Sequence, residues 1–149
     1  MRAEASEAAE GAWTATVAAA LLRRGAMVHA ASLVLTMSAL LGATVWSIVA
    51  AGHGLGWLSL GAAIVILGIV EFWLAARVAL DAELFDAIAA KEADLEGFDR
   101  AMRALGLMPP DKAGRALTKR VQAAFRLLKL QALMLGLQIG VLVLGAFGA

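Results

Sequence analysis

The sequence predicts an all-α integral membrane protein with three transmembrane helices and a cytoplasmic helical hairpin between the second and the third. Composition is the first reason: of 149 residues, 62% are hydrophobic and 17% are charged, whereas about a quarter of the residues in a soluble domain are charged. Clustering is the second reason. The apolar residues fall into uncharged windows of roughly 20 residues, the length of helix that crosses about 30 Å of hydrocarbon.

Three predominantly apolar spans have this length, at residues 27–51, 57–76 and 130–149, and the second contains one charged residue, Glu71. Only a short Gly-rich turn separates the first two, so residues 27–77 are expected to form a transmembrane hairpin. Basic residues flank the spans at the ends away from this turn, namely Arg23, Arg24, Arg77, Arg126 and Lys129. Because Lys and Arg are retained in the cytoplasm, we expect a cytoplasmic N-terminus and a periplasmic C-terminus. The Ala-, Gly- and Leu-rich usage favours a bacterial inner membrane.

The segment before the first span, residues 1–26, has a different character. It begins acidic and Ala-rich and becomes apolar from Trp13 onward. The apolar part is too short to cross a bilayer. We therefore expect a cytoplasmic or interfacial amphipathic segment that Trp13 anchors at the membrane surface.

Residues 78–129 predict the cytoplasmic hairpin. Apolar residues recur at alternating three- and four-residue steps, which is the spacing of helices that pack against each other. Gly106 and the pair Pro109–Pro110 end the first arm, and Asp111 can begin the second. The side chains expected to make the hairpin contacts are Leu84, Ile88, Leu95, Phe98, Met102, Leu105, Leu117, Val121, Phe125 and Leu128.

The two arms of this hairpin have opposite charge, since the first is mainly acidic and the second mainly basic. The basic side chains in question are Arg115, Lys119, Arg120, Arg126 and Lys129. They can pair with the acidic arm, bind anionic lipid headgroups, or simply form a solvated face. Exposed ion pairs contribute only about 0–1 kcal/mol each, so pairing would set the register of the arms more than their stability.

Glu71 is a carboxylate inside the second span. Counting 1.5 Å per residue from the middle of the span places it about 6 Å inside the cytoplasmic edge of the hydrocarbon. An ionised side chain at that depth needs a partner. His29, Ser32 and Gln131 lie at similar depth in the other spans and can form a polar layer with it. Glu71 is therefore a structural clamp, a snorkelling side chain or a site for a proton or ion.

Small residues in the spans favour close contact between helices. Ser38 and Gly42 form one small-xxx-small motif, and Gly136 and Gly140 form another. Gln138 lies deep in the third span, where its amide requires an interhelical hydrogen bond. These residues are expected to pack helices together, within the chain or against other chains.

The residue types exclude several classes of function. The chain contains no Cys, so thiol chemistry and Cys-based metal sites are absent. No metal-ligand cluster or phosphate-binding loop is present, and His29 and His53 lie too far apart in one chain to hold the same haem. The net charge of +1 is not that of a nucleic-acid-binding domain. We expect no enzyme, no metal and no cofactor.

Three spans bury little surface, so association with other chains is expected. The favoured interpretation is a non-catalytic accessory, assembly or scaffolding subunit of a larger membrane complex. One alternative is a homo-oligomeric channel or proton-coupled transporter that uses Glu71. A weaker alternative is a membrane-active protein like the holins. The expected partners are the lipid bilayer, other membrane subunits or further copies of this chain, and anionic lipids.

Overall fold

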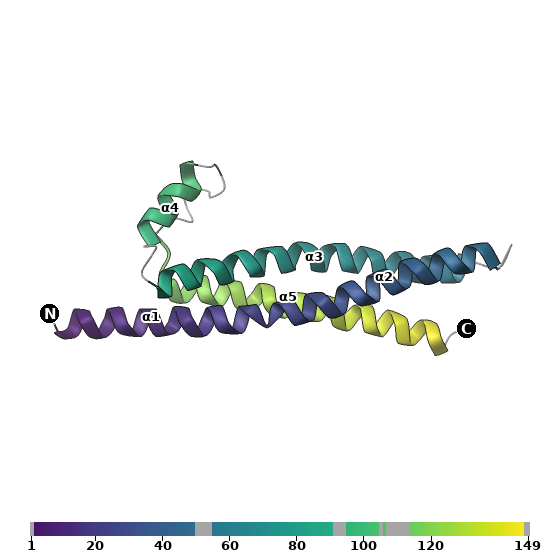
Figure 1. The fold of residues 1–149 in the computed structure, drawn as a ribbon, viewed down its shortest axis with the longest axis horizontal. Coiled ribbons are helices and arrows are strands. Elements are labelled where there is room, and N and C mark those ends of the chain that lie inside the picture. Colours follow the sequence, from purple (N-terminus) through teal and green to yellow (C-terminus); the bar gives the residue numbers. More distant parts are fainter. Residues whose placement is uncertain (1, 50–54, 91–94, 105, 107–113, 148–149) are drawn as a thin grey trace. The chain divides into compact units, whose positions relative to one another are not determined.

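The computed structural model describes residues 2–49, 55–90, 95–104, 106 and 114–147. These residues form five helices and no strand (Figure 1): α1 (Arg2–Arg23), α2 (Gly25–Val49), α3 (Leu55–Ala89), α4 (Leu95–Ala104) and α5 (Leu117–Phe147). Three stretches are long and apolar enough to cross a membrane, namely Ala9–Val45, Leu58–Ala89 and Leu117–Gly145. The fold is therefore all-helical and has the number of membrane-compatible helices that the sequence predicts.

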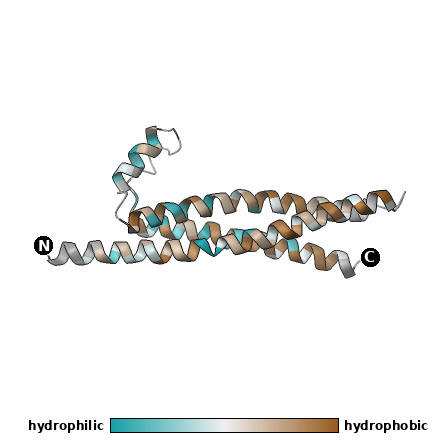
Figure 2. Cartoon of the chain, in the orientation of Figure 1, coloured by the Kyte–Doolittle hydropathy of each residue, from teal (hydrophilic) through white to brown (hydrophobic). Residues whose placement is uncertain are grey.

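The helices differ in hydropathy. Hydrophobic residues dominate α3 and α5 over most of their length, whereas hydrophilic residues are frequent in α4 (Figure 2). The chain divides into two compact units. Unit 1 comprises residues 1–24 and 78–126, and unit 2 comprises residues 25–77 and 127–149. Each is described by itself.

Unit 2 buries polar and small residues together with Ile64 and Leu74, and many of its large apolar side chains are exposed. Its most deeply buried polar side chains are those of Ser32, Glu71, Gln131 and Gln138. Its exposed side chains include the large apolar residues Leu33, Val34, Ile66, Ile69, Phe72 and Leu144. A water-soluble helix bundle has the opposite distribution, because large apolar side chains gain most from leaving water. This arrangement is typical of helices whose surroundings are themselves apolar.

Glycines allow the helices of unit 2 to approach closely. A Cβ added at Gly68 of α3 would overlap the hydroxyl of Thr36 and lie 3.1 Å from Nε2 of Gln138. A Cβ at Gly145 of α5 would lie 2.9 Å from a methyl group of Leu60. The overlap at Gly68 leaves no room for a side chain there, whereas at Gly145 the end of the Leu60 side chain would have to shift.

Unit 1 has a core built largely from alanine. Ala15, Ala18 and Ala19 of α1 are at most 1% exposed, and Leu22, Val78, Ala82 and Ala124 are buried as well. Phe85 of α3 is the largest fully buried side chain and is 1% exposed. An ion pair joins Arg23 of α1 to Asp86 of α3. Small residues thus let α1 lie close to its neighbours in this unit.

The side chains expected in the hairpin are distributed as follows. Leu84, Ile88, Met102, Leu117, Val121, Phe125 and Leu128 are partly buried. The side chains of Leu95 and Phe98, together with Leu105, Pro109, Pro110 and Asp111, lie outside the described residues. Residues 78–89 continue α3 without interruption, and α5 begins at Leu117. Gly106 and Gly114 have φ values of +67° and +71°, which favour glycine because it lacks a Cβ.

Candidate functional site

The strongest cluster of polar side chains lies in unit 2 and is centred on Glu71. Its side chain is 1% exposed. Oε1 of Glu71 accepts a hydrogen bond of 2.8 Å from Nε2 of Gln131, and Oε2 lies 2.9 Å from Nδ1 of His29. Nε2 of Gln131 also donates to the carbonyl oxygen of Gly25 at 2.9 Å. We call Glu71, His29 and Gln131 the first polar layer. It joins α2, α3 and α5.

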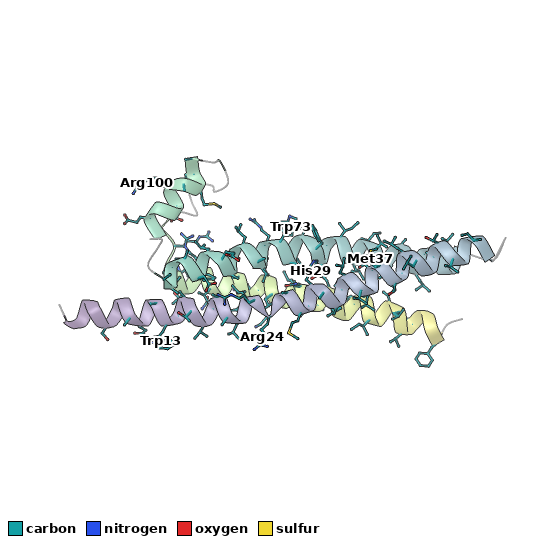
Figure 3. All side chains as sticks on the ribbon, viewed as in Figure 1. Trp13, Arg24, His29, Met37, Trp73 and Arg100 are labelled. Carbon is teal, nitrogen blue, oxygen red and sulfur yellow. The ribbon has the colours of Figure 1, made fainter. Side chains whose placement is uncertain are left out.

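His29 forms the outer edge of this layer. Its side chain is 29% exposed, and its ring lies 5.7 Å from the ring of Phe72 at an angle of 56°. Figure 3 shows His29 on the part of α2 that lies beside α3. Where Glu71 is a carboxylate, both of its oxygens are acceptors, and Nδ1–H of His29 is then the donor of this hydrogen bond.

A second polar layer is centred on Gln138 of α5. Its Oε1 accepts a hydrogen bond of 2.7 Å from the hydroxyl of Ser32, and its Nε2 donates to Thr36 Oγ1 at 3.0 Å and to the carbonyl oxygen of Ile64 at 3.2 Å. The Thr36 hydroxyl donates in turn to the carbonyl oxygen of Ser32 at 2.9 Å. The amide of Gln138 is thus fully hydrogen-bonded although it is 0% exposed.

The structure therefore distributes the four predicted partners over two layers. Glu71, His29 and Gln131 lie together, whereas Ser32 is bonded to Gln138. Sequence reasoning did not identify Thr36 or the carbonyl group of Ile64. The signal was present in the spacing: Gln131 and Gln138 are seven residues apart, and the polar residues of α2 follow steps of three and four, at His29, Ser32 and Thr36. Such spacing keeps residues on one helix face.

The chemistry open to the first layer is limited. Among the described residues, the only buried side-chain polar atom without a hydrogen-bond partner is Oε1 of Gln131. A cavity of about 180 Å³ adjoins the layer and is lined by His29, Ser32, Thr36, Gly68 and Glu71 with three apolar side chains. The described part of the chain contains no group of three or more His, Cys, Asp or Glu side chains that could hold a metal ion. The layer can clamp three helices together and can hold a proton.

Both small-residue motifs are exposed. Ser38 and Gly42 line an apolar cavity of about 350 Å³ in unit 2, and a Cβ added at Gly42 would meet no atom within 4 Å. Gly136 and Gly140 are exposed, and a Cβ added at either would meet no atom within 4 Å. At 100° per residue, this pair lies on the side of α5 opposite Gln138. Within the described chain, Gly136 and Gly140 therefore pack against nothing.

The basic side chains of the hairpin region also separate into two kinds. Nη2 of Arg120 lies 2.6 Å from Oδ1 and 2.8 Å from Oδ2 of Asp99, and the N–H of Gly114 donates to Oδ2 at 2.8 Å. The hydrogen bond from the N–H of Gly114 is the main cause that holds the pKa of Asp99 below its ordinary value, and Arg120 lowers the pKa further. Burial of Asp99 acts in the opposite direction. The remaining side chains of the predicted set are exposed, namely Arg115, Lys119, Arg126 and Lys129.

Comparisons with models of protein families, with curated proteins and with solved structures gave no match for this chain.

Proposed function

We propose that the chain is a multi-pass membrane protein that acts as a non-catalytic accessory, assembly or scaffolding subunit of a larger membrane complex. In this proposal α2, α3 and α5 supply the spans at residues 27–51, 57–76 and 130–149. The basic residues at the span ends support a cytoplasmic N-terminus and a periplasmic C-terminus in a bacterial inner membrane. The large apolar side chains exposed on unit 2 support a lipid environment.

One contrast carries the accessory role: the polar groups of the spans bond to each other, while a Cβ added at Gly136 or Gly140 of α5 would meet no atom within 4 Å among the described residues. Both oxygens of Glu71 have partners within the chain, so its burial is explained without a transported ligand. Gly136 and Gly140, by contrast, are exposed and have no side chains, so they leave an open helix face. Small residues spaced by four let a second helix approach closely in lipid. We infer that this face receives a helix of another subunit.

The test is extraction of the full untagged chain from its native membrane in mild detergent, followed by mass spectrometry of everything that remains bound. Gly136→Leu and Gly140→Leu would fill the proposed face, since a Cβ at either position meets no atom within 4 Å. Ala62→Leu is the matched control, because Ala62 is an exposed small residue of α3. We expect a stoichiometric set of other membrane proteins, lost in the two glycine variants and kept in the control.

Recovery of a homo-oligomer alone would refute the accessory role. Equal partner recovery in the glycine variants and the control would refute the assignment of the docking face. These two results are separate, because the first concerns which partner is bound and the second concerns where it binds.

The channel or transporter alternative has one observation in its favour. The hydrogen bond of Glu71 to the partly exposed His29, beside a cavity of about 180 Å³, could pass a proton between surroundings and carboxylate. Proton flux in liposomes that Glu71→Gln abolishes would support this alternative. Absence of flux in liposomes with the unaltered chain would exclude it.

A further inference from the structure

The apolar cavity of about 350 Å³ in unit 2 lies between α2, α3 and α5. Its exposed lining residues are Ser38 and Gly42 of α2 and Leu142 of α5. Its buried lining residues are Ile64 of α3 and Gly145 of α5. The cavity therefore opens to the surroundings between α2 and α5, and Ile64 lies at its buried end.

Small residues leave this space unfilled. Gly42 has no side chain, and a Cβ added there would meet no atom within 4 Å. The three helices are nevertheless in contact nearby: a Cβ added at Gly61 would lie 3.4 Å from Cβ of Ala43, and one added at Gly145 would lie 2.9 Å from a methyl group of Leu60. The helices therefore cannot close the cavity by moving together. Because an empty cavity destabilises a fold in proportion to its volume, we expect a molecule from the surroundings to fill it.

The cavity belongs to the part of the chain that is proposed to cross the membrane. All of its lining residues fall within the spans at residues 27–51, 57–76 and 130–149. At 1.5 Å per residue, Ile64 lies about 10 Å from the start of its span, Ser38 about 17 Å and Leu142 about 18 Å from the starts of theirs. Since the hydrocarbon is about 30 Å thick, the opening faces acyl chains rather than headgroups.

The walls and the volume restrict what can enter. Among the described residues that line the cavity, Ser38 has the only polar side chain, whereas a buried water needs roughly two to four hydrogen-bond partners. A docked helix is too large, because a single turn of a helix about 10 Å across takes up roughly 400 Å³. An apolar cavity of about 150 Å³ holds benzene, so by proportion 350 Å³ holds about 14 carbon atoms. That is the size of a single hydrocarbon chain.

We infer that this cavity is a binding site for one acyl chain of a membrane phospholipid, inserted between α2 and α5. The bilayer supplies such chains along the whole opening, and the methylenes gain dispersion contacts with walls that otherwise face empty space. The inference rests on the proposed membrane location but not on the accessory role.

Photolabelling of the full chain in liposomes tests the inference. A fraction of the phosphatidylcholine carries a diazirine at the middle or at the end of one acyl chain, and mass spectrometry locates the label after irradiation. Ile64 is 5% exposed, and its neighbour Ile66 on α3 is 61% exposed. Leu74 of α3 is also 5% exposed but does not line the cavity, and its neighbour Trp73 is 58% exposed. Each buried residue is thus compared with an exposed residue at nearly the same depth.

The expected result is a difference between the two buried residues. If labelling followed exposure alone, Ile64 and Leu74 would each receive about a tenth of the label of their exposed neighbours. An acyl chain in the cavity should raise this fraction about ten-fold at Ile64, so that it labels like its neighbour, and leave the fraction at Leu74 unchanged.

The exposed residues separate the possible failures. Label on Ile66 and Trp73 with equally low fractions at Ile64 and Leu74 would overturn the acyl-chain site and leave the membrane location intact. Absence of label from Ile66 and Trp73 would overturn the membrane location itself. Equally high fractions at both buried residues would also overturn the site, because labelling would then not depend on the cavity.

Gly42→Leu tests the route of entry. The added side chain has space at the opening, so the fraction at Ile64 should fall to that at Leu74. Ala31→Leu is the matched control, because Ala31 is an exposed small residue of α2 that does not line the cavity. Circular dichroism checks that both variants keep their helix content, and the result for the unaltered chain does not depend on either variant. Unchanged labelling of Ile64 in Gly42→Leu would refute entry between α2 and α5.

The identity of the occupant has its own measurement. Lipids that remain bound to the full chain after extraction from its native membrane are identified by mass spectrometry. We expect phospholipid, in an amount that Gly42→Leu lowers and Ala31→Leu does not. An isoprenoid lipid that shows this dependence in place of phospholipid would overturn the assignment.

Discussion

Replacing Gly68 by Ala should separate α2 from α3 in unit 2. The added Cβ would overlap the hydroxyl of Thr36 and crowd the amide of Gln138, and these two groups hydrogen-bond to each other at 3.0 Å. Overpacking costs about 1–3 kcal/mol, and a lost interhelical hydrogen bond in a membrane costs about 0.6 kcal/mol. Ala also favours a helix over Gly by about 0.5–1 kcal/mol.

Gly136→Ala is the control that isolates the packing cost. It brings the same helix preference, but its Cβ meets nothing within 4 Å. Gly68→Ala should therefore be less stable than Gly136→Ala by about 1.6–3.6 kcal/mol, the sum of the overpacking and hydrogen-bond costs. Reversible unfolding in mixed micelles, followed by circular dichroism during titration with sodium dodecyl sulfate, measures the difference.

A disulfide reports the same packing directly. A Cβ at Gly61 would lie 3.4 Å from Cβ of Ala43, close to the Cβ separation of a disulfide. The chain contains no Cys, so Ala43→Cys with Gly61→Cys creates a single pair. Its rate of oxidation should fall when Gly68→Ala is added and not when Gly136→Ala is added. Equal stabilities and equal rates for the two alanine variants would refute the close approach of the helices at Gly68.

Other substitutions test the polar layers and the hairpin region. Glu71→Gln should be tolerated, since an amide can accept from Gln131 and donate to the other tautomer of His29. Glu71→Leu removes one of the two acceptors of the buried Gln131 amide, which keeps its bond to Gly25, and this loss costs about 1–3 kcal/mol. Gln138→Leu should destabilise unit 2 by about 1–3 kcal/mol because it strands buried hydrogen-bonding groups. The contacts of Asp99 with Gly114 and Arg120 should be insensitive to pH above about 4 and should weaken below it. A carboxyl group whose pKa is lowered in the folded chain contributes stability that is lost only as the group is protonated.

Each of these expectations has a defined readout. Unfolding midpoints in mixed micelles rank the Glu71 and Gln138 variants, and equal midpoints for Glu71→Gln and Glu71→Leu would contradict the hydrogen-bond argument. Hydrogen exchange of the amide of Gly114, measured between pH 3 and pH 7 and corrected for the intrinsic rate, follows the Asp99 contact. Loss of its protection near neutral pH would contradict the lowered pKa.

The number of membrane-compatible helices could be predicted from the sequence, while the rotation of each helix about its axis could not. The apolar windows correspond to three helices long enough to cross a membrane, and the depth estimate for Glu71 selected two side chains, His29 and Gln131, that the structure places against it. Depth says nothing about which way a side chain faces around its helix. The depth estimate therefore grouped Ser32 with Glu71. In the structure the hydroxyl of Ser32 donates instead to the amide oxygen of Gln138, which follows Gln131 by seven residues on α5.

The hairpin region shows a second limit of pattern reading. Leu84 and Ile88 fit a stripe with steps of three and four, but the fully buried side chain in this part of α3 is Phe85. The residues before it in the buried series are Val78 and Ala82. Where nearly every residue is apolar, several stripes fit the same segment. Only the neighbouring helices decide which stripe is buried.

The polar layers have a consequence for biosynthesis. Both glutamine amides belong to α5, which the ribosome makes after α2 and α3. Until α5 is made, Glu71 lacks one hydrogen-bond donor and the hydroxyl of Ser32 lacks its acceptor. In the proposed membrane location both deficits are costly, because hydrocarbon offers no substitute partner. Packing of α5 removes both deficits, so α2 and α3 are less stable together before the last helix is made than after it.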